Sequence, residues 1–445
     1  MKERIDEKDI LRFENEYKSN DKYLAMRNAV SKHGINDIVY NIDEAAKMSF
    51  KFSLEIPTMP ATNQKASGRC WIFAGLNLLR EKVGKKYNLE NFEISQNYIA
   101  FWDKFEKINY MLESIIETAD READDRTVSW ILSTGIQDGG QWDMFVNILK
   151  KYGAVPKDAM PESFHSSNTG SMNQWLNHKL REDAAVLRRT IAEKGIEEAY
   201  KVKENMLSEM YRILCICFGV PPKSFDFEYV DKNKKYYAYR NITPKQFLDE
   251  FVGDTLDEYV SIINAPTKDK PFEKTYTVKF LGNVKEGRKI LYLNLSINEM
   301  KKLIIKQLKD GEIVWFGSDV GKYGDREKGI WDDKSYSIGE GLGISFGITK
   351  EEQLDYRDSK MTHAMVITGV NLIEDGSADR WKIENSWGDD RGNKGYYIIS
   401  DTWFDRYVYQ AVINKKYLTD EQQKMLKIEP IALNPWDPMG SLANL

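Results

Sequence analysis

The sequence predicts an α+β fold in which a helical half carries a nucleophilic cysteine, a β-rich half carries a histidine and an asparagine, and a cleft lies between them. Apolar side chains recur with the period of a helix from about residue 70 to 218, and with the period of a strand after residue 270. A chain of 445 residues can bury an extensive core, either in one large domain with insertions or in two to three domains.

The nucleophile candidate is Cys70, which the loop residues 67–69 deliver to the first turn of an apolar helix. Unpaired N–H groups and the macrodipole at a helix N-terminus favour a thiolate there. A lone cysteine is more often a small buried hydrophobe than a nucleophile. The downstream partners of Cys70 reverse this interpretation.

Three residues supply the partners that a thiol nucleophile needs. His363 opens a β-branched, apolar run and would take the thiol proton, while Asn385 ends another strand-like segment and would orient the imidazole. The side chain of Gln64 and the backbone N–H of Cys70 would stabilise an oxyanion. We therefore predict a catalytic site of Cys70, His363, Asn385 and Gln64, with Trp387 shielding the bond between His363 and Asn385.

These motifs have a family resemblance. The order of the motifs resembles that of the papain-like cysteine peptidases, and within them the bleomycin hydrolase or aminopeptidase C branch. The motifs are Gln64, Gly-Arg-Cys-Trp at 68–71, His-Ala-Met at 363–365, Glu-Asn-Ser-Trp-Gly at 384–388 and the C-terminal residues 434–443. The resemblance implies a papain-like two-lobed fold, aminopeptidase action on short peptide substrates, bleomycin hydrolase-like amide hydrolysis and a homohexamer.

The resemblance also assigns a role to the C-terminus. In the family a C-terminal arm lies in the active-site cleft, and its terminal carboxylate can pair with the ammonium group of the substrate. This chain continues past Ala443 with Asn444 and Leu445. The binding carboxylate would therefore belong to Ala443 after trimming, or to Leu445. Within the cleft, Gly139 and Gly140 are the expected substrate-binding residues, although a plain turn explains them equally well.

A large helical insertion is expected between the catalytic residues. His363 follows Cys70 by 363 − 70 = 293 positions, whereas compact papain-like enzymes need roughly 130–150. The strongest helical periodicity covers residues 171–217, where Gly195 separates two helices. Such helices could form an assembly surface that the catalytic chemistry does not need.

We divide the chain accordingly into five parts. The expected parts are an N-terminal segment that wraps the catalytic body (1–54), a helical lobe with Cys70 (55–164), the helical insertion (165–260), a β-rich lobe with His363 and Asn385 (261–425) and the C-terminal arm (426–445). Strands are expected at 275–281, 290–295, 313–317, from 363 and at 395–399, with a helix at 297–310.

Composition excludes several other classes. A net charge of −5 argues against a mainly nucleic-acid-binding protein, and the basic residues 232–235 with their tyrosines are expected to be a solvated loop. Three cysteines and a charged N-terminus indicate a cytoplasmic protein without a membrane span. Cys215 and Cys217 lack zinc-site spacing, so we expect no metal and no cofactor. An amidase or acyltransferase with the same cysteine nucleophile stays the alternative function.

Overall fold

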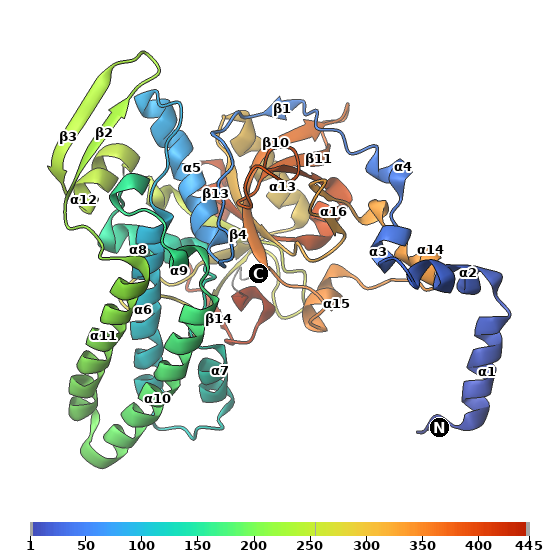
Figure 1. Cartoon of the computed structure of the whole chain (residues 1–445), viewed down its shortest axis with the longest axis horizontal. Coiled ribbons are helices and arrows are strands. Elements are labelled where there is room, and N and C mark those ends of the chain that lie inside the picture. The colour runs from blue at the N-terminus through green and yellow to red at the C-terminus, as the bar shows by residue number, and fades with distance from the viewer. Residues whose placement is uncertain (1–2, 254, 442–445) are drawn as a thin grey trace.

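Helix α5, Cys70–Tyr87, lies between the two halves of the molecule in the computed structural model of the chain, which describes residues 3–253 and 255–441 (Figure 1). Every residue from Cys70 to Arg80 is buried, so this helix must be covered on all sides. Helices α6 and α8 cover one side and strands β7 and β10 the other. The predicted α+β architecture, with helices in one half and strands in the other, is confirmed.

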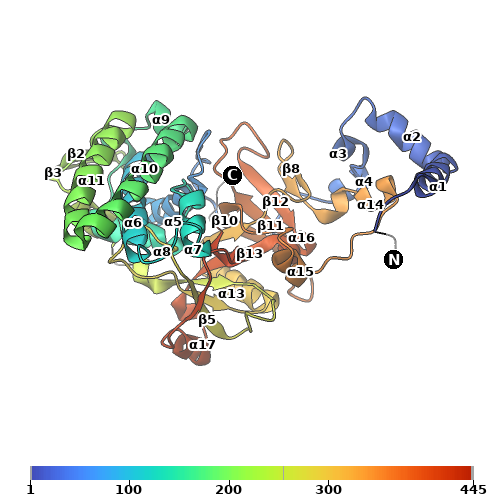
Figure 2. The same cartoon turned by 90° about the horizontal axis from the view of Figure 1, so that it is seen from below.

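The helical half is built around a pair of long antiparallel helices, α10 and α11, which turn at Gly195 and pack along α6 (Figures 1 and 2). Gly195 has φ +86°, a left-handed conformation that favours glycine, and this ends the first helix as predicted. The helices of this half are α5, α6 (Gln96–Glu117), α7 (Arg126–Thr134), α8 (Trp142–Tyr152), η1 (Lys157–Ala159), α9 (Phe164–Ser167), α10 (Gly170–Lys194) and α11 (Ile196–Phe218).

The insertion also contains a β-hairpin that the sequence analysis missed. Strands β2 (Phe225–Val230) and β3 (Tyr236–Ile242) are joined by a turn, and the rings of Phe227 and Tyr239 pack on Phe251. The expectation of a solvated loop is therefore wrong from Tyr236 onward. Aromatic contacts across the pair hold the hairpin against the short elements α12 (Pro244–Phe247), η2 (Leu248–Val252) and η3 (Leu256–Glu258).

The β half is a single curved sheet with strand order β14-β5-β6-β4-β13-β7-β10-β11-β12-β9-β8, and β1 pairs with β10. Its central strands β4, β6, β7 and β13 and the short β9 are buried along their whole length. Helices α13 and α16 contact the sheet, and α5 contacts β10 from the other half. The strands are β1 (Leu54–Glu55), β4 (Tyr259–Ile263), β5 (Lys274–Val278), β6 (Tyr292–Asn294), β7 (Val314–Ser318), β8 (Gly324–Asp325), β9 (Ile330–Trp331), β10 (His363–Leu372), β11 (Ala378–Glu384), β12 (Tyr396–Ser400), β13 (Val408–Asn414) and β14 (Ile431–Leu433).

The sheet register explains how two distant residues meet. Strands β10 and β11 are antiparallel with Val366 opposite Glu384. The start of β10, at His363, therefore lies beside the end of β11, where Asn385 follows. The remaining helices are α13 (Ile297–Lys309), η4 (Asp333–Ser335), α14 (Ile338–Leu342), α15 (Lys350–Asp355), α16 (Asp401–Tyr407), η5 (Lys415–Tyr417), α17 (Asp420–Met425) and η6 (Pro438–Gly440).

The N-terminal segment does not wrap the catalytic body of its own chain. Helices α1 (Glu7–Lys18) and α2 (Asp21–Val30) have no buried residue and project from the β half (Figures 1 and 2). Helix α2 contacts α14 of the β half, and the part from α3 (Ile35–Ile38) and α4 (Ile42–Ala45) returns to the sheet side, where Asn41 N–H donates to the Ser335 carbonyl. The expectation was wrong because an amphipathic pattern predicts an apolar face without saying what covers it.

Across the described residues, the helices lack the combination of length and apolar character that crossing a membrane requires.

Candidate active site

The cysteine stands where the sequence predicted, at the first position of α5. Arg69 is the residue before the helix, and the Cys70 side chain is completely buried. The Ala364 N–H donates to the Cys70 Sγ at 3.5 Å, so the thiol faces the beginning of β10 across the boundary between the halves. The nucleophile candidate and the histidine strand are therefore brought together.

His363 and Asn385 form the predicted pair. The Nε2 atom of His363 lies 2.9 Å from the Asn385 Oδ1, which also accepts the Ser386 N–H at 2.8 Å. Because Oδ1 can only accept, we assign the proton to Nε2. The Nδ1 atom then carries a lone pair, and within the described residues it has no hydrogen-bond partner. It is the ring nitrogen available to receive the thiol proton.

Trp387 covers this pair from outside. Its ring lies 4.9 Å from the His363 ring, centroid to centroid, at an interplanar angle of 32°. An apolar ring at this position keeps water from competing for the hydrogen bond between His363 and Asn385. The shielding role expected of Trp387 agrees with this geometry.

Gln64 is held by the residue that follows Asn385. The Ser386 hydroxyl donates to Gln64 Oε1 at 2.6 Å, and the Gln64 backbone N–H donates to the Ser386 carbonyl at 2.8 Å. This fixes the orientation of the Gln64 amide, whose Nε2 also donates to the Ser67 carbonyl at 2.5 Å. The second N–H of Nε2 is left for an oxyanion, as the proposed role of Gln64 requires.

Burial acts against the expected charge state of the relay. Burial raises the pKa of the Cys70 thiol to about 12, against the opposing effect of the backbone N–H groups of Ala364, Trp71 and Cys70. Burial also lowers the pKa of His363 to about 4, while its hydrogen bond with Asn385 acts in the other direction. Burial therefore opposes the charged form of both groups, while the helix N-terminus and the Asn385 hydrogen bond favour it. The thiolate–imidazolium pair that the helix N-terminus and His363 were expected to form stays a prediction.

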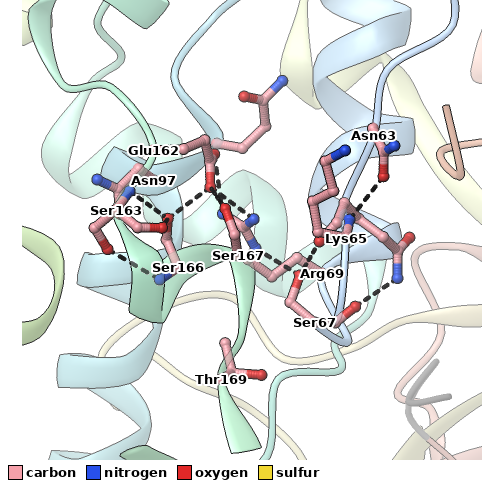
Figure 3. A network of polar contacts seen from close by, with 12 residues as sticks. Asn63, Lys65, Ser67, Arg69, Asn97, Glu162, Ser163, Ser166, Ser167 and Thr169 are labelled. Carbon is pink, nitrogen blue, oxygen red and sulfur yellow. Dashed lines mark hydrogen bonds and ion pairs between the residues drawn. The ribbon is translucent and has the colours of Figure 1, made fainter.

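An ion pair between the buried Arg69 and the partly buried Glu162 fixes the residue directly before the nucleophile (Figure 3). Arg69 donates two parallel hydrogen bonds to Glu162, at 3.1 Å from Nη1 and 2.8 Å from Nη2. Its Nε donates to the Ser67 Oγ at 2.9 Å, and this hydroxyl donates to the Gln64 carbonyl at 2.6 Å. Burial acts to raise the pKa of Glu162, but Arg69 lowers it overall, so the carboxylate stays charged.

A second carboxylate holds the same loop from its other side. The buried Asp138 accepts the Gly68 N–H at 3.0 Å, and it also receives bonds from Lys104, Thr169 and Asn173. Burial acts to raise the pKa of Asp138, but Lys104 and these donors hold it well below its usual range. Thr169 and Asn173 belong to the start of the insertion, which is therefore part of the support of the nucleophile. The expectation that residues 165–260 are independent of the catalytic chemistry was wrong at this end.

A third buried contact joins the two halves behind the relay. Arg80 Nη2, on α5, lies 2.8 Å from the Glu384 Oε1, one residue before Asn385, and also donates to the Pro60 carbonyl at 3.0 Å. Asn77 donates to the same Glu384 oxygen at 2.8 Å. Burial raises the pKa of Glu384 to about 7, and Arg80 opposes this rise. These contacts fix α5, the strand that ends just before Asn385 and the segment that leads to Gln64 in position relative to one another.

Gly139 and Gly140 lie beside the nucleophile helix. The Gly139 carbonyl accepts from Lys107 at 2.7 Å, and a Cβ on Gly140 would approach the Trp71 ring to 2.5 Å. Close packing on Trp71 thus explains why position 140 is glycine. Substrate binding by these two residues stays a prediction. Ala443 and Leu445, the expected carriers of the binding carboxylate, lie outside the described residues.

Sequence reasoning did not identify Glu162, Arg80 and Glu384, or the role of Asp138. One signal was present in the motif itself, because an arginine directly before a buried cysteine needs a buried acidic partner. Which of the 69 acidic residues supplies it could not be read from a single sequence.

We expect Cys70→Ala to abolish peptide hydrolysis and Asn385→Ala to lower kcat less. General base catalysis contributes roughly 10²–10⁴-fold, and loss of the group that only orients the base should cost about 10²-fold. Steady-state kinetics will test this, with Asn371→Ala, on the same sheet but bonded to Asp379, as the matched control. A kcat for Asn385→Ala equal to that of the control would remove Asn385 from the relay.

Glu162→Gln should lower both stability and turnover, because it leaves the buried Arg69 without its carboxylate. Breaking a buried pair costs on the order of 3 kcal/mol, and a small shift of the nucleophile can cost about 10²-fold in rate. The control is Glu198→Gln, in an exposed pair with Lys201, which should change stability by less than about 0.5 kcal/mol. Thermal unfolding and kcat/KM are measured side by side, and full activity of Glu162→Gln would show that the ion pair does not position Cys70.

Comparison with known proteins gives one consistent result. The model of the Peptidase C1-like family matches residues 4–440. Aminopeptidase C of Listeria monocytogenes is 47% identical over 431 residues, 97% of each chain, and that of Streptococcus thermophilus is 48% identical over 430 residues, 96% of this chain and 97% of its own. The crystal structure of PepW from Lactobacillus rhamnosis superposes with a TM-score of 0.98 at 48% identity, covering 100% of both chains.

A match over nearly the whole chain agrees with the site, since the motifs at Gln64, Cys70, His363 and Asn385 all lie inside the matched residues. The chain belongs to the Peptidase C1-like family of papain-like cysteine peptidases, in its aminopeptidase C and bleomycin hydrolase branch.

Proposed function

We propose that this protein is a cysteine aminopeptidase that removes the N-terminal residue from short peptides, with bleomycin hydrolase-like amide hydrolysis as part of the same activity. Cys70 Sγ attacks the scissile carbonyl as its proton passes to His363 Nδ1. Gln64 Nε2 and the Cys70 N–H stabilise the oxyanion. His363 then returns the proton to the leaving amine, and water hydrolyses the thioester by the same route in reverse.

The observation that carries exopeptidase action is the path of the C-terminal arm. Gln141, beside the Asp138 loop, donates from Nε2 to the Ser441 carbonyl at 2.8 Å, and the Ser441 hydroxyl donates to the carbonyl of Met361, two residues before His363. Ser441 thus contacts both halves of the molecule close to His363, which supports an arm that closes one end of the cleft. A substrate with residues upstream of the cleaved bond would collide with it.

Several contacts hold the arm in this path. The Asp437 carboxylate lies 3.0 Å from Lys270 Nζ, the Tyr292 hydroxyl donates to the Met439 carbonyl at 3.2 Å, and Arg126 stacks on the Trp436 ring at 3.9 Å. Met439 and Gly440 are buried. An arm fixed this firmly can select substrates by exclusion as well as by attraction.

We expect the enzyme to hydrolyse a peptide with a free amino group and to leave its N-acetylated form intact. Removing residues 437–445 should admit the acetylated peptide, because the blocked end of the cleft opens. Rates on the pair of peptides, measured with both proteins and with Cys70→Ala as the blank, test this. A truncated enzyme that still requires a free amine would exclude the arm as the selector, and transfer of the acyl group to an added amine in preference to water would favour the acyltransferase alternative.

We also propose a cytoplasmic homohexamer. Support for assembly comes from large apolar side chains left exposed on helices, among them Phe13 and Ile10 on α1 and Trp175 and Ile216 on α10 and α11. We expect analytical ultracentrifugation to give about six times the chain mass at micromolar concentration, and Trp175→Glu or Phe13→Glu to lower it. The exposed polar change Ser129→Glu on α7 is the control, and a monomeric wild type would end the proposal.

A further inference from the structure

A stack of three side chains lies at one edge of the relay. Trp387 packs on His363, and the guanidinium carbon of Arg326 lies 4.9 Å from the Trp387 ring centroid. The Arg326 side chain is exposed, and among the described residues its guanidinium has no ion pair and no hydrogen bond. The Arg326 guanidinium therefore lies over the Trp387 ring, which in turn covers His363. It is available to bind a ligand.

The loop that carries Arg326 is well fixed. Asp325 Oδ1 accepts the N–H groups of Glu327 at 3.1 Å and Lys328 at 3.0 Å, and the Asp325 carbonyl accepts the Gly329 N–H at 2.9 Å. The Tyr397 hydroxyl donates to the Arg326 carbonyl at 3.2 Å. A guanidinium on such a loop is preorganised, so binding an anion requires little ordering of the backbone.

A second exposed cation, Lys65, belongs to the segment that pairs with Trp387. Asn63 forms an isolated bridge with Trp387, and the Lys65 N–H donates to Asn63 Oδ1 at 2.9 Å (Figure 3). Lys65 directly follows Gln64, has φ +54°, and forms no ion pair within the described part of the chain. A lysine in the left-handed region costs free energy that a structural turn would avoid by using glycine or asparagine.

The direction of the substrate assigns these cations to one of its ends. The arm contacts Met361 and Gln141 at one end of the cleft, so the amino end of the substrate points there. The leaving amine extends the opposite way from the scissile carbonyl. His363 returns its proton to the leaving amine, and Trp387 packs on His363. The residue that carries the leaving amine is therefore placed beside Trp387.

We propose that Arg326, assisted by Lys65, binds the free α-carboxylate of the residue that carries the leaving amine, which makes short peptides with a charged C-terminus, dipeptides above all, the preferred substrates. The proposal rests on the aminopeptidase function above and names its substrate class. A guanidinium matches a carboxylate with two parallel hydrogen bonds, and the Trp387 ring removes water from one face of the pair. A neutral amide at the same position would leave both cations unpaired.

The charge of Arg326 also reaches the relay, because it acts with burial to lower the pKa of His363. A carboxylate bound to Arg326 would offset this effect and favour the imidazolium that forms during attack. Substrate binding would then assist the proton transfer that the resting site opposes.

The test compares alanyl-glycine with alanyl-glycinamide, each measured as kcat/KM at the plateau of the pH profile of the enzyme used. For the wild type we expect the free dipeptide to be preferred by about 10-fold or more, an effect of about 1.4 kcal/mol. Arg326→Gln should bring the ratio close to one by raising KM for the dipeptide alone, and Lys65→Gln should lower it in part. Arg326→Lys, which keeps the charge but loses the fork, should lie between.

The control is Arg391→Gln, because Arg391 is exposed nearby but lies 3.5 Å from the Glu327 carboxylate; it should keep the wild-type ratio. A wild-type ratio near one, or an unchanged ratio in Arg326→Gln, would overturn the proposal while activity on the amide still upheld the aminopeptidase function. No Cys70-dependent cleavage of either compound would instead refute the function on which the proposal rests.

Discussion

The active site depends on two carboxylates, the buried Asp138 and the partly buried Glu162, that hold one short loop. Residues 64–69 must present the Gln64 amide, the Cys70 N–H and the Cys70 thiol in a single geometry, yet they contain no regular structure before α5. Glu162 fixes Arg69 and Asp138 fixes Gly68, so the loop is held at both of the residues before the nucleophile. Each carboxylate is charged and at least partly removed from water, and each accepts hydrogen bonds from several donors. Without these bonds, removing the charge from water would be strongly unfavourable.

This arrangement joins catalysis to the helical insertion. Glu162 stands just before α9, and Thr169 and Asn173 stand at the start of α10, so the entry of the insertion encloses the nucleophile loop. The Ala66 N–H donates to the Ser167 carbonyl and the Ala66 carbonyl accepts from Thr169, which adds a backbone bridge. The helical insertion is therefore connected to the loop of residues 64–69 by hydrogen bonds as well as by side-chain packing.

Much of the site could be predicted from sequence because its elements are local. The apolar run after Cys70 predicts the helix start, the β-branched run after His363 predicts the strand, and the position of Asn385 at a strand end follows from the same pattern. What could not be predicted depends on long-range placement: the pairing of Arg80 with Glu384, the projection of α1 and α2, and the hairpin of β2 and β3. The burial of Cys70 and His363 belongs to this group too, since the sequence shows the helix N-terminus that favours a thiolate but not the burial that opposes it.

The complete burial of Cys70 has a consequence for its exposure to oxidants. Peroxides and electrophiles modify cysteines that are both ionised and accessible. The Cys70 side chain has no exposed surface, and burial acts to raise the pKa of its thiol. A reagent must therefore enter the space between the two halves before it can reach the nucleophile, so burial slows the oxidation of Cys70.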